Sequence, residues 1–271
     1  MTGRAVLVRV GALSKRDAII ELSYTFQLFL RFTAVAMSVV MFFFLGRLVG
    51  QPEELSGYRG GYFEFALVGL VVMGYSQACV NSFAQSIQRA QTSGTLEILL
   101  ATATRLPTLL AGTLIVPLAL ASVDASFYVV VGAALGALNV EVGRIVLAAL
   151  LLTLTLGTFA AVGVFSAAII VLTKRGDPLS SLVLQASNLL AGAVFPVSIL
   201  PAPLQVLSRF VPAFYGLRGT RTVLLSDGGF ADVSGDIAVL CAFNVLLLPL
   251  ATWALSRALR TARVIGTLGN R

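Results

Sequence analysis

Histidine is absent from this chain of 271 residues, and only 11% of its residues are charged. A chain without histidine cannot ligate haem iron or zinc through imidazole, and it lacks the side chain that most often serves as a general base. Soluble proteins carry about 25% charged residues. A chain so poor in charge leaves no room for a separate soluble catalytic domain, so we expect neither an enzyme nor a metal site.

Lysine and cysteine are also scarce. The only lysines, Lys15 and Lys174, are each followed by arginine. A P-loop needs a lysine followed by serine or threonine after a glycine-rich turn. This chain therefore cannot bind ATP in that way, and any ATP and magnesium that drive its work must be bound by a separate ATPase. Cys79 and Cys241 fall inside apolar segments, where we expect buried free thiols rather than a disulfide.

Hydrophobic residues are abundant, at 58% of the chain, and they form six long segments. About 20 residues of helix cross a hydrocarbon core of about 30 Å, and a helix satisfies its own backbone polar groups there. We therefore predict an all-α, polytopic membrane protein with six transmembrane helices. The predicted spans are Tyr24–Leu48, Tyr62–Phe83, Leu106–Leu138, Ile145–Leu172, Leu182–Leu200 and Ile237–Leu259.

The distribution of lysine and arginine predicts the orientation. Six spans place both termini on one side, and that side carries twelve of these residues against six on the other side. The excess of positive charge marks the cytoplasmic side. We expect a multi-pass protein of the cell membrane with both termini in the cytoplasm. The net charge of +7 is scattered over the span edges, which argues against binding to nucleic acid.

Residues 1–23 precede the first span. Apolar residues alternate there with Arg9, Lys15 and Arg16 at roughly helical spacing. This pattern predicts an amphipathic interfacial helix on the cytoplasmic membrane surface; a disordered basic leader is the alternative. Residues 24–271 are then expected to form one six-span transmembrane domain.

Polar residues occur inside several predicted spans. Asp124 lies near the middle of the third span, and Arg31 lies in the first. A carboxylate in hydrocarbon is costly to desolvate unless it faces a cavity or a partner. Asp124 is therefore either a functional group or a structural one paired with Arg31. Gln185 and Asn188 in the fifth span either line a path or form hydrogen bonds between helices.

The stretch after the fifth span is rich in proline. Proline prevents one continuous helix, yet the neighbouring residues remain apolar. We predict short re-entrant helices that dip back into the outer leaflet. The residues that mark this segment are Phe195, Pro196, Leu200, Pro201 and Pro212.

A polar segment from Gln85 to Leu100 separates the second and third spans. It is the largest inner loop between spans. Polar side chains combine there with the apolar triplet Ile98–Leu100, which is typical of a surface that docks a soluble partner.

These two stretches resemble the membrane permeases of the type-2 ATP-binding-cassette (ABC) exporter family, which includes daunorubicin-resistance, antibiotic-export and polysaccharide-export permeases. Gly94, Thr95, Leu96 and Glu97 match the family's Gly-Thr-Leu-Glu signature in the loop that docks the ATPase. The proline pattern after the fifth span also matches, and the six-span layout covers essentially the whole chain. The family often has acidic residues before Gly-Thr and a proline after it, whereas the residues here are Arg89, Gln91, Ser93 and Ala103.

The resemblance implies a mechanism shared between chains. Two permeases, this chain and a second copy or a paralogue, pack side by side in the bilayer, and each contacts an ABC ATPase subunit. Glu97 would contact the ATPase. Phe195, Pro196 and the rest of the re-entrant segment would form an outer gate; the alternative is a structural cap over the outer ends of the spans. The substrate would be an amphipathic drug-like or lipid-linked molecule moved out of the cytoplasm or inner leaflet. The alternative is an ion-coupled secondary transporter or channel that works without an ATPase and uses Asp124 and Arg31.

Overall fold

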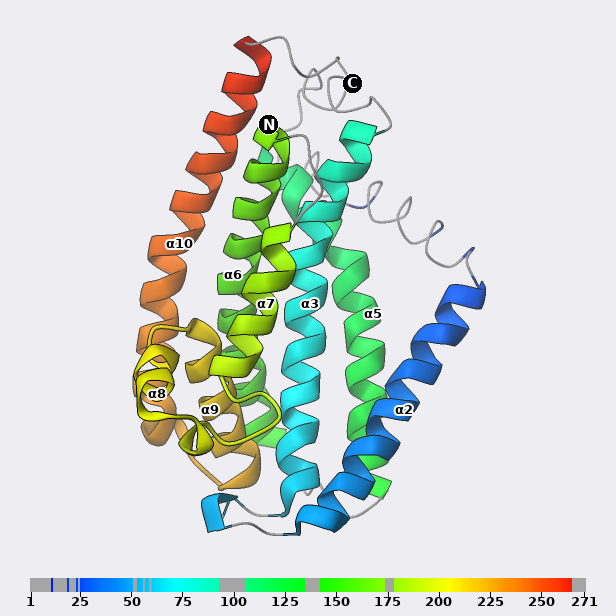
Figure 1. Cartoon of the computed structure of the whole chain (residues 1–271), viewed down its shortest axis with the longest axis vertical. Helices are drawn as coiled ribbons and strands as arrows, with labels where there is room; N and C mark the ends of the chain where they lie inside the picture. The colour runs from blue at the N-terminus through cyan, green and yellow to red at the C-terminus, as the bar shows by residue number, and fades with distance from the viewer. Residues whose placement is uncertain are drawn as a thin grey trace.

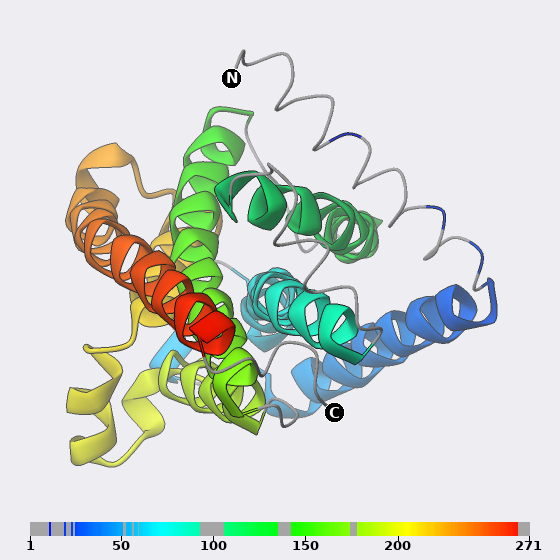
Figure 2. The same ribbon diagram turned by 90° about the horizontal axis from the view of Figure 1, so that it is seen from above.

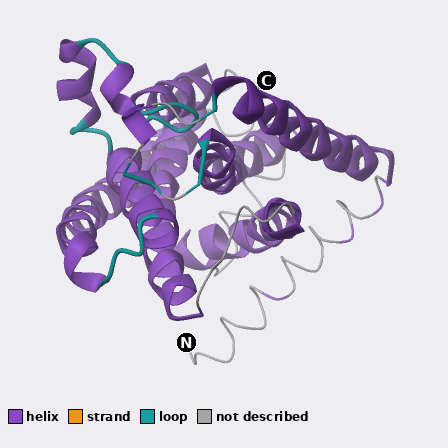
Figure 3. Ribbon diagram, turned by 90° about the horizontal axis from the view of Figure 1, so that it is seen from below, coloured by secondary structure: helices purple, strands orange, loops and turns teal. Residues whose placement is uncertain are grey.

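The computed structural model confirms the all-α fold over the residues that it describes. These are residues 25–50, 53–55, 57–58, 60–92, 106–134, 142–173 and 178–264, with the isolated residues 11, 19 and 23. No strand occurs in this part of the chain, and Figure 3 shows only helices and the loops that join them. Two predictions lie outside it: most of the interfacial helix, and the motif Gly94–Glu97 that is expected to dock the ATPase.

Eight α-helices are described, and five of them are long and apolar enough to cross a membrane. The five are α2, α3, α5, α6 and α10, with candidate spans Leu28–Val49, Tyr62–Gln88, Gly112–Gly132, Gly143–Thr173 and Phe230–Thr261. The complete set of elements is α2 (Thr25–Val49), η1 (Glu53–Leu55), α3 (Tyr62–Thr92), α5 (Leu106–Ala134), α6 (Val142–Thr173), α7 (Pro178–Leu190), η2 (Val197–Ile199), α8 (Ala202–Ser208), α9 (Pro212–Leu225) and α10 (Phe230–Val264).

The helix α3 occupies the centre of the bundle, where it packs against α6, α5 and α2 (Figure 1 and Figure 2). Small residues allow the long helices to approach closely, which is a common basis of packing in membranes. A Cβ atom at Gly163 of α6 would lie 2.8 Å from the carbonyl oxygen of Val80 in α3. A Cβ at Gly157 would collide with the carboxamide of Asn244 in α10, and that carboxamide donates to the Leu154 carbonyl at 2.8 Å.

The fifth predicted span is much shorter than expected. The helix α7 has 13 residues and ends at Leu190, whereas the prediction continued it to Leu200. At 1.5 Å per residue, α7 is roughly 20 Å long, less than the hydrocarbon thickness of about 30 Å. In Figure 1 it descends through the middle of the bundle, and the chain then stays in the lower half until α10 rises again. The sequence stays apolar beyond residue 190, so hydropathy alone did not indicate that the helix ends there.

The helices α3 and α10 extend well beyond their predicted bounds. The helix α3 continues to Thr92, so the residues from Gln85 to Thr92 are helical and not part of a loop. The polar side chains of this stretch do not break a helix, and a membrane helix can continue beyond the hydrocarbon core. Polarity alone was therefore not evidence for a loop. The helix α10 begins at Phe230, seven residues before the predicted Ile237.

The cysteine prediction is confirmed for one residue and wrong for the other. Cys79 is buried, and its thiol donates to the Leu156 carbonyl at 3.4 Å. Cys241 is exposed on the surface of α10. Both are free thiols.

Candidate functional site

The chain turns sharply after α7, just before the predicted gate segment, which runs from Phe195 to Pro212. Gly192 has φ +67°, which favours glycine. The Gly192 N–H donates to the Leu189 carbonyl at 3.1 Å, and the Ala193 N–H donates to the Asn188 carbonyl at 3.0 Å. These two bonds form a Schellman motif with glycine at the C′ position. A Cβ at Gly192 would also lie 2.6 Å from the Phe195 carbonyl oxygen, so glycine is required here.

The guanidinium of Arg221 in α9 holds the main chain of this turn. Its Nη1 donates to the Gly192 carbonyl at 2.8 Å, and its Nη2 donates to the Ala193 carbonyl at 2.5 Å. Nη2 also donates to the Phe65 carbonyl of α3 at 3.2 Å, and the guanidinium carbon lies 3.4 Å from the centroid of the Phe65 ring. Arg221 is only 3% exposed. One buried cation therefore satisfies three main-chain carbonyls and stacks on an aromatic face.

Burial lowers the pKa of the Arg221 guanidinium to about 9, because desolvation disfavours the charged form. The group still carries its charge at neutral pH. The charge strengthens its hydrogen bonds to the carbonyls, since charge-assisted bonds are roughly twice as strong as neutral ones.

The helix α3 completes this arrangement. The hydroxyl of Tyr62 donates to the Val194 carbonyl at 2.8 Å. Gly69 lies against the main chain of Ala193, where a Cβ would collide with the carbonyl oxygen. Three successive carbonyls of the turn, at residues 192–194, are thus bound by side chains of α3 and α9. We call this arrangement the Arg221 node and define it by Tyr62, Phe65, Gly69, Gly192 and Arg221.

The five predicted gate residues all lie in the segment that leaves the Arg221 node. Pro196 is buried, Phe195 and Leu200 are half-buried, and Pro201 is exposed. Pro212 occupies the first turn of α9, where a missing N–H is tolerated. The structure divides this segment into the short helices η2, α8 and α9, as proline predicts. In the end-on view of Figure 2, α8 projects from the side of the bundle.

Close packing and an ion pair fix α9 on the bundle. A Cβ at Gly216 would collide with the hydroxyl of Thr155 in α6. Arg218 forms an ion pair with Asp236 of α10, and its guanidinium carbon lies 5.4 Å from the centroid of the Tyr215 ring. Asp236 is only 4% exposed, so the pair is partly desolvated. A displacement of α6 or α10 is therefore expected to move α9, and α9 in turn to move the gate segment.

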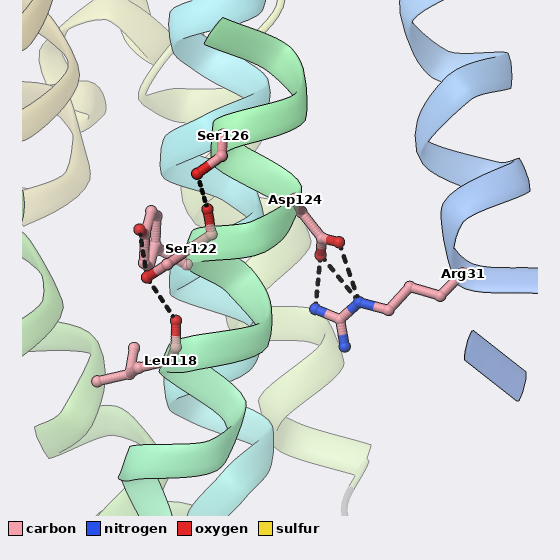
Figure 4. Close-up of polar contacts among 6 residues, drawn as sticks. Arg31, Leu118, Ser122, Asp124 and Ser126 are labelled. Atoms are coloured by element: carbon pink, nitrogen blue, oxygen red, sulfur yellow. Dashed lines mark hydrogen bonds and ion pairs between the residues drawn. The ribbon is translucent and has the colours of Figure 1, made fainter. Parts of the chain in front are cut away.

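Arg31 and Asp124 form the ion pair that the structural interpretation of Asp124 requires. Nε of Arg31 donates to both carboxylate oxygens of Asp124, at 3.2 and 2.9 Å, and Nη2 donates to Oδ2 at 2.5 Å. Figure 4 shows the guanidinium of α2 reaching across to the carboxylate of α5. The exposed fractions are 34% for the Arg31 side chain and 14% for Asp124.

The other two polar candidates belong to a different part of the bundle. Gln185 is exposed and Asn188 is half-buried, and both lie on α7. This helix packs mainly against α3, α6, α8 and α9, whereas the ion pair joins α2 and α5. The structure therefore does not gather the four polar candidates into one site.

A polar face of α3 was not recognised from the sequence. Gly74, Gln77, Asn81, Gln85 and Gln88 recur at intervals of three or four residues. At about 100° per residue they fall within about 80° of one another. Asn81 is half-buried and the other four are exposed, while the opposite face of α3 is buried in the bundle. We call these five residues the amide face of α3.

The regular spacing could have revealed this face. It was missed because the helix was predicted to end at Phe83, which assigned Gln85 and Gln88 to a loop. In the part of the chain that the structure describes, no group of three or more histidine, cysteine, aspartate or glutamate residues could hold a metal ion.

Comparison with known proteins identifies the family. A family model described as ABC-2 type transporter matches residues 10–225. A search of curated proteins gave no match to this sequence. The family match covers the spans α2, α3, α5 and α6 together with the gate segment, which is most of the chain. The chain therefore belongs to the ABC-2 type transporter family and is an ABC-type membrane permease.

Proposed function

We propose that this chain is the membrane permease of an ABC exporter of the cell membrane. Two copies, or this chain and a paralogue, pack side by side. A separate ABC ATPase subunit binds ATP and magnesium and contacts each permease at Gly94–Glu97. The cargo is an amphipathic drug-like or lipid-linked molecule that leaves the cytoplasm or inner leaflet. Both termini lie in the cytoplasm.

The amide face of α3 is the observation that carries this proposal. Transfer of an amide from water to hydrocarbon, where nothing can hydrogen-bond to it, costs about 4–8 kcal/mol. The carboxamides of Gln77 and Asn81, which lie within the candidate span of α3, are therefore unsuited to contact with lipid chains. A second permease that covers this face, with an aqueous path between the two copies, resolves the conflict. Gln77 and Asn81 would then line the path.

The length of α3 connects this path to the ATPase. The helix continues without interruption to Thr92, two residues before Gly94. A rigid helix transmits a displacement at one end to the other. When the ATPase closes and moves Gly94–Glu97, the amide face moves with it.

The Arg221 node connects the other end of α3 to the gate. Tyr62, Phe65 and Gly69 all lie in the first third of α3, and they contact the turn that precedes Phe195 and Pro196. Movement of α3 therefore displaces the gate segment without a flexible intermediary. In this proposal α7 is the fifth crossing, and the short helices after it dip into the outer leaflet and complete a six-crossing topology.

The ion-coupled alternative is disfavoured by the Arg31–Asp124 pair. A carboxylate that binds and releases a proton or cation must be free of a permanent counter-charge in at least one state. Asp124 instead accepts three hydrogen bonds from one guanidinium. Bidentate pairing of this kind fixes the position of the carboxylate relative to α2.

Affinity purification from solubilised native membranes, followed by an ATPase assay of the eluate, tests the proposal. We expect a P-loop ATPase to co-purify with the wild-type chain and to be lost with Glu97→Lys. Glu53→Lys, which reverses a charge in η1, is the matched control and should retain the ATPase. Both variants should insert into the membrane normally. A wild-type chain that purifies alone, with no ATPase activity, would overturn the proposal.

A further inference from the structure

The Arg31–Asp124 pair occupies an unusual place. Among the described residues it is the only ion pair whose two members both lie within candidate spans. Asp124 lies near the middle of the span Gly112–Gly132. Charged residues at such depth are rare and commonly mark the path of a substrate or ion.

Hydrogen bonding uses only one edge of the Arg31 guanidinium. Asp124 occupies Nε and Nη2, and no described residue accepts a hydrogen bond from Nη1. Figure 4 shows the third nitrogen directed away from the carboxylate. A guanidinium has five N–H donors in a planar fork, so the edge formed by Nη1 and Nη2 can bind a second anion bidentately. Arg31 is also the more exposed partner, at 34% against 14% for Asp124.

The surroundings of this free edge are open to the bilayer. None of the described side chains from Thr25 to Ala34 is buried, and the first buried residue of α2 is Val35. The beginning of α2 leans away from the other helices in Figure 1. Phe29 and Phe32 are exposed on the turns next to Arg31. A molecule with an apolar chain can therefore reach the guanidinium from the lipid phase, between α2 and α5.

A contribution to stability is not enough to explain why an ion pair lies at this position. Replacing a buried ion pair with apolar residues of similar volume is often neutral or stabilising. The guanidinium of Arg31 is oriented by Asp124 of α5, and its second edge has no hydrogen-bond partner among the described residues. Such pre-orientation reduces the entropy lost when a ligand binds.

We propose that the free edge of Arg31 binds the acidic headgroup, a carboxylate or a phosphate, of a membrane amphiphile that enters between α2 and α5. The inference rests on the proposed function, because the amphiphile is the cargo of the exporter. A resident lipid keeps its headgroup at the membrane surface, whereas Asp124 lies near the middle of its span. An acidic headgroup at this depth therefore belongs to a molecule in transit.

Three fluorescent probes test the inference on the full-length chain in nanodiscs of neutral lipid. Each probe has the same labelled twelve-carbon chain and ends in a carboxylate, a hydroxyl or a trimethylammonium group. We expect the wild type to bind the carboxylate probe at least tenfold more tightly than the hydroxyl probe. Arg31→Gln should abolish this preference. Asp124→Asn should increase it, because the competing carboxylate is removed while the guanidinium remains.

Arg47→Gln is the matched control, since Arg47 lies at the other end of α2 and its guanidinium stacks on Phe43. This variant should bind like the wild type. Melting temperatures of all variants are measured in the same nanodiscs. If Arg31→Gln does not fold, the double variant Arg31→Gln, Asp124→Asn leaves a neutral amide pair and should show no preference for the carboxylate.

Equal binding of the three probes to the wild type overturns the inference, and so does a carboxylate preference that survives Arg31→Gln. A preference for the trimethylammonium probe that is lost in Asp124→Asn would instead assign a cationic amphiphile to Asp124. The binding assay contains neither ATPase nor ATP. Its failure is therefore distinct from failure of the exporter proposal, which is tested by co-purification.

Discussion

Arg221 and Gly192 are 29 residues apart in the sequence, and the Nη1 of Arg221 donates to the Gly192 carbonyl at 2.8 Å. The bond joins α9 to the turn that ends α7. The same guanidinium also binds the carbonyl of Phe65 in α3. The position of the turn therefore depends on the packing of both α3 and α9. This end of the bundle is thus held together by one side chain.

Replacement of Arg221 by lysine should destabilise the protein despite the conserved charge. A single ammonium cannot reproduce the fork that binds three carbonyls and stacks on Phe65. Buried carbonyls left without donors cost about 1–3 kcal/mol each, so we expect a loss of about 3 kcal/mol. Thermal unfolding in detergent measures the effect. Arg209→Lys, at an exposed position after α8, is the control and should unfold like the wild type. Equal stability of the two variants would show that the Arg221 contacts are dispensable.

Gly192→Ala should also be destabilising, for a reason that concerns the backbone. A non-glycine residue with left-handed dihedrals costs about 1–2 kcal/mol, and the added Cβ would lie 2.6 Å from the Phe195 carbonyl oxygen. We expect a lower melting temperature and impaired export, because the gate segment begins at this turn. Gly235→Ala in α10 provides the comparison, since a Cβ there meets nothing within 4 Å. The explanation fails if both alanine variants melt at the same temperature.

Five of the six spans could be predicted from the sequence, and the Arg31–Asp124 pair could be recognised as one alternative, because hydrophobicity and charge act locally and strongly in lipid. Two opposite charges in apolar helices stabilise each other, and this restricts their possible partners. The role of Arg221 could not be predicted in the same way. Its partners are main-chain carbonyls, which every residue has, so no side chain in the sequence identifies them.

The errors in helix length have a related cause. Hydropathy continues from Leu182 through Leu200, but the helix ends at Leu190 because Gly192 adopts a left-handed conformation. In α3 the opposite error occurred. Polar residues after Phe83 were assigned to a loop, although carboxamides at helical spacing are compatible with a helix that presents them on one face.

Cysteine labelling should establish the orientation that the distribution of lysine and arginine predicts. In a background with Cys79 and Cys241 replaced by alanine, we expect Ser56→Cys to react with a membrane-impermeant maleimide added outside intact cells. Ser93→Cys should react only after the inner face is exposed, in inverted vesicles. The reason is the larger number of positive residues on the side that carries Ser93. The reverse labelling pattern would invert the topology and place the gate segment in the cytoplasm.

Replacement of two carboxamides on the amide face should separate transport from stability. Gln77→Leu combined with Asn81→Leu removes polar groups that are costly in contact with lipid, so the isolated chain should be as stable as the wild type or more stable. If the amide face lines an aqueous path, the same change should slow export at least tenfold, which corresponds to about 1.4 kcal/mol in the barrier.

Export of a fluorescent substrate from vesicles that contain the permease and its ATPase measures the rate, and co-purification confirms that the ATPase still binds. Gln77→Asn combined with Asn81→Gln keeps both amides and serves as the control. We expect this control to export at nearly the wild-type rate. A leucine variant that exports normally would show that the amide face is covered by protein and does not contact the cargo. The path would then have to lie elsewhere, and the exposed edge of Arg31 between α2 and α5 would become the first place to look for it.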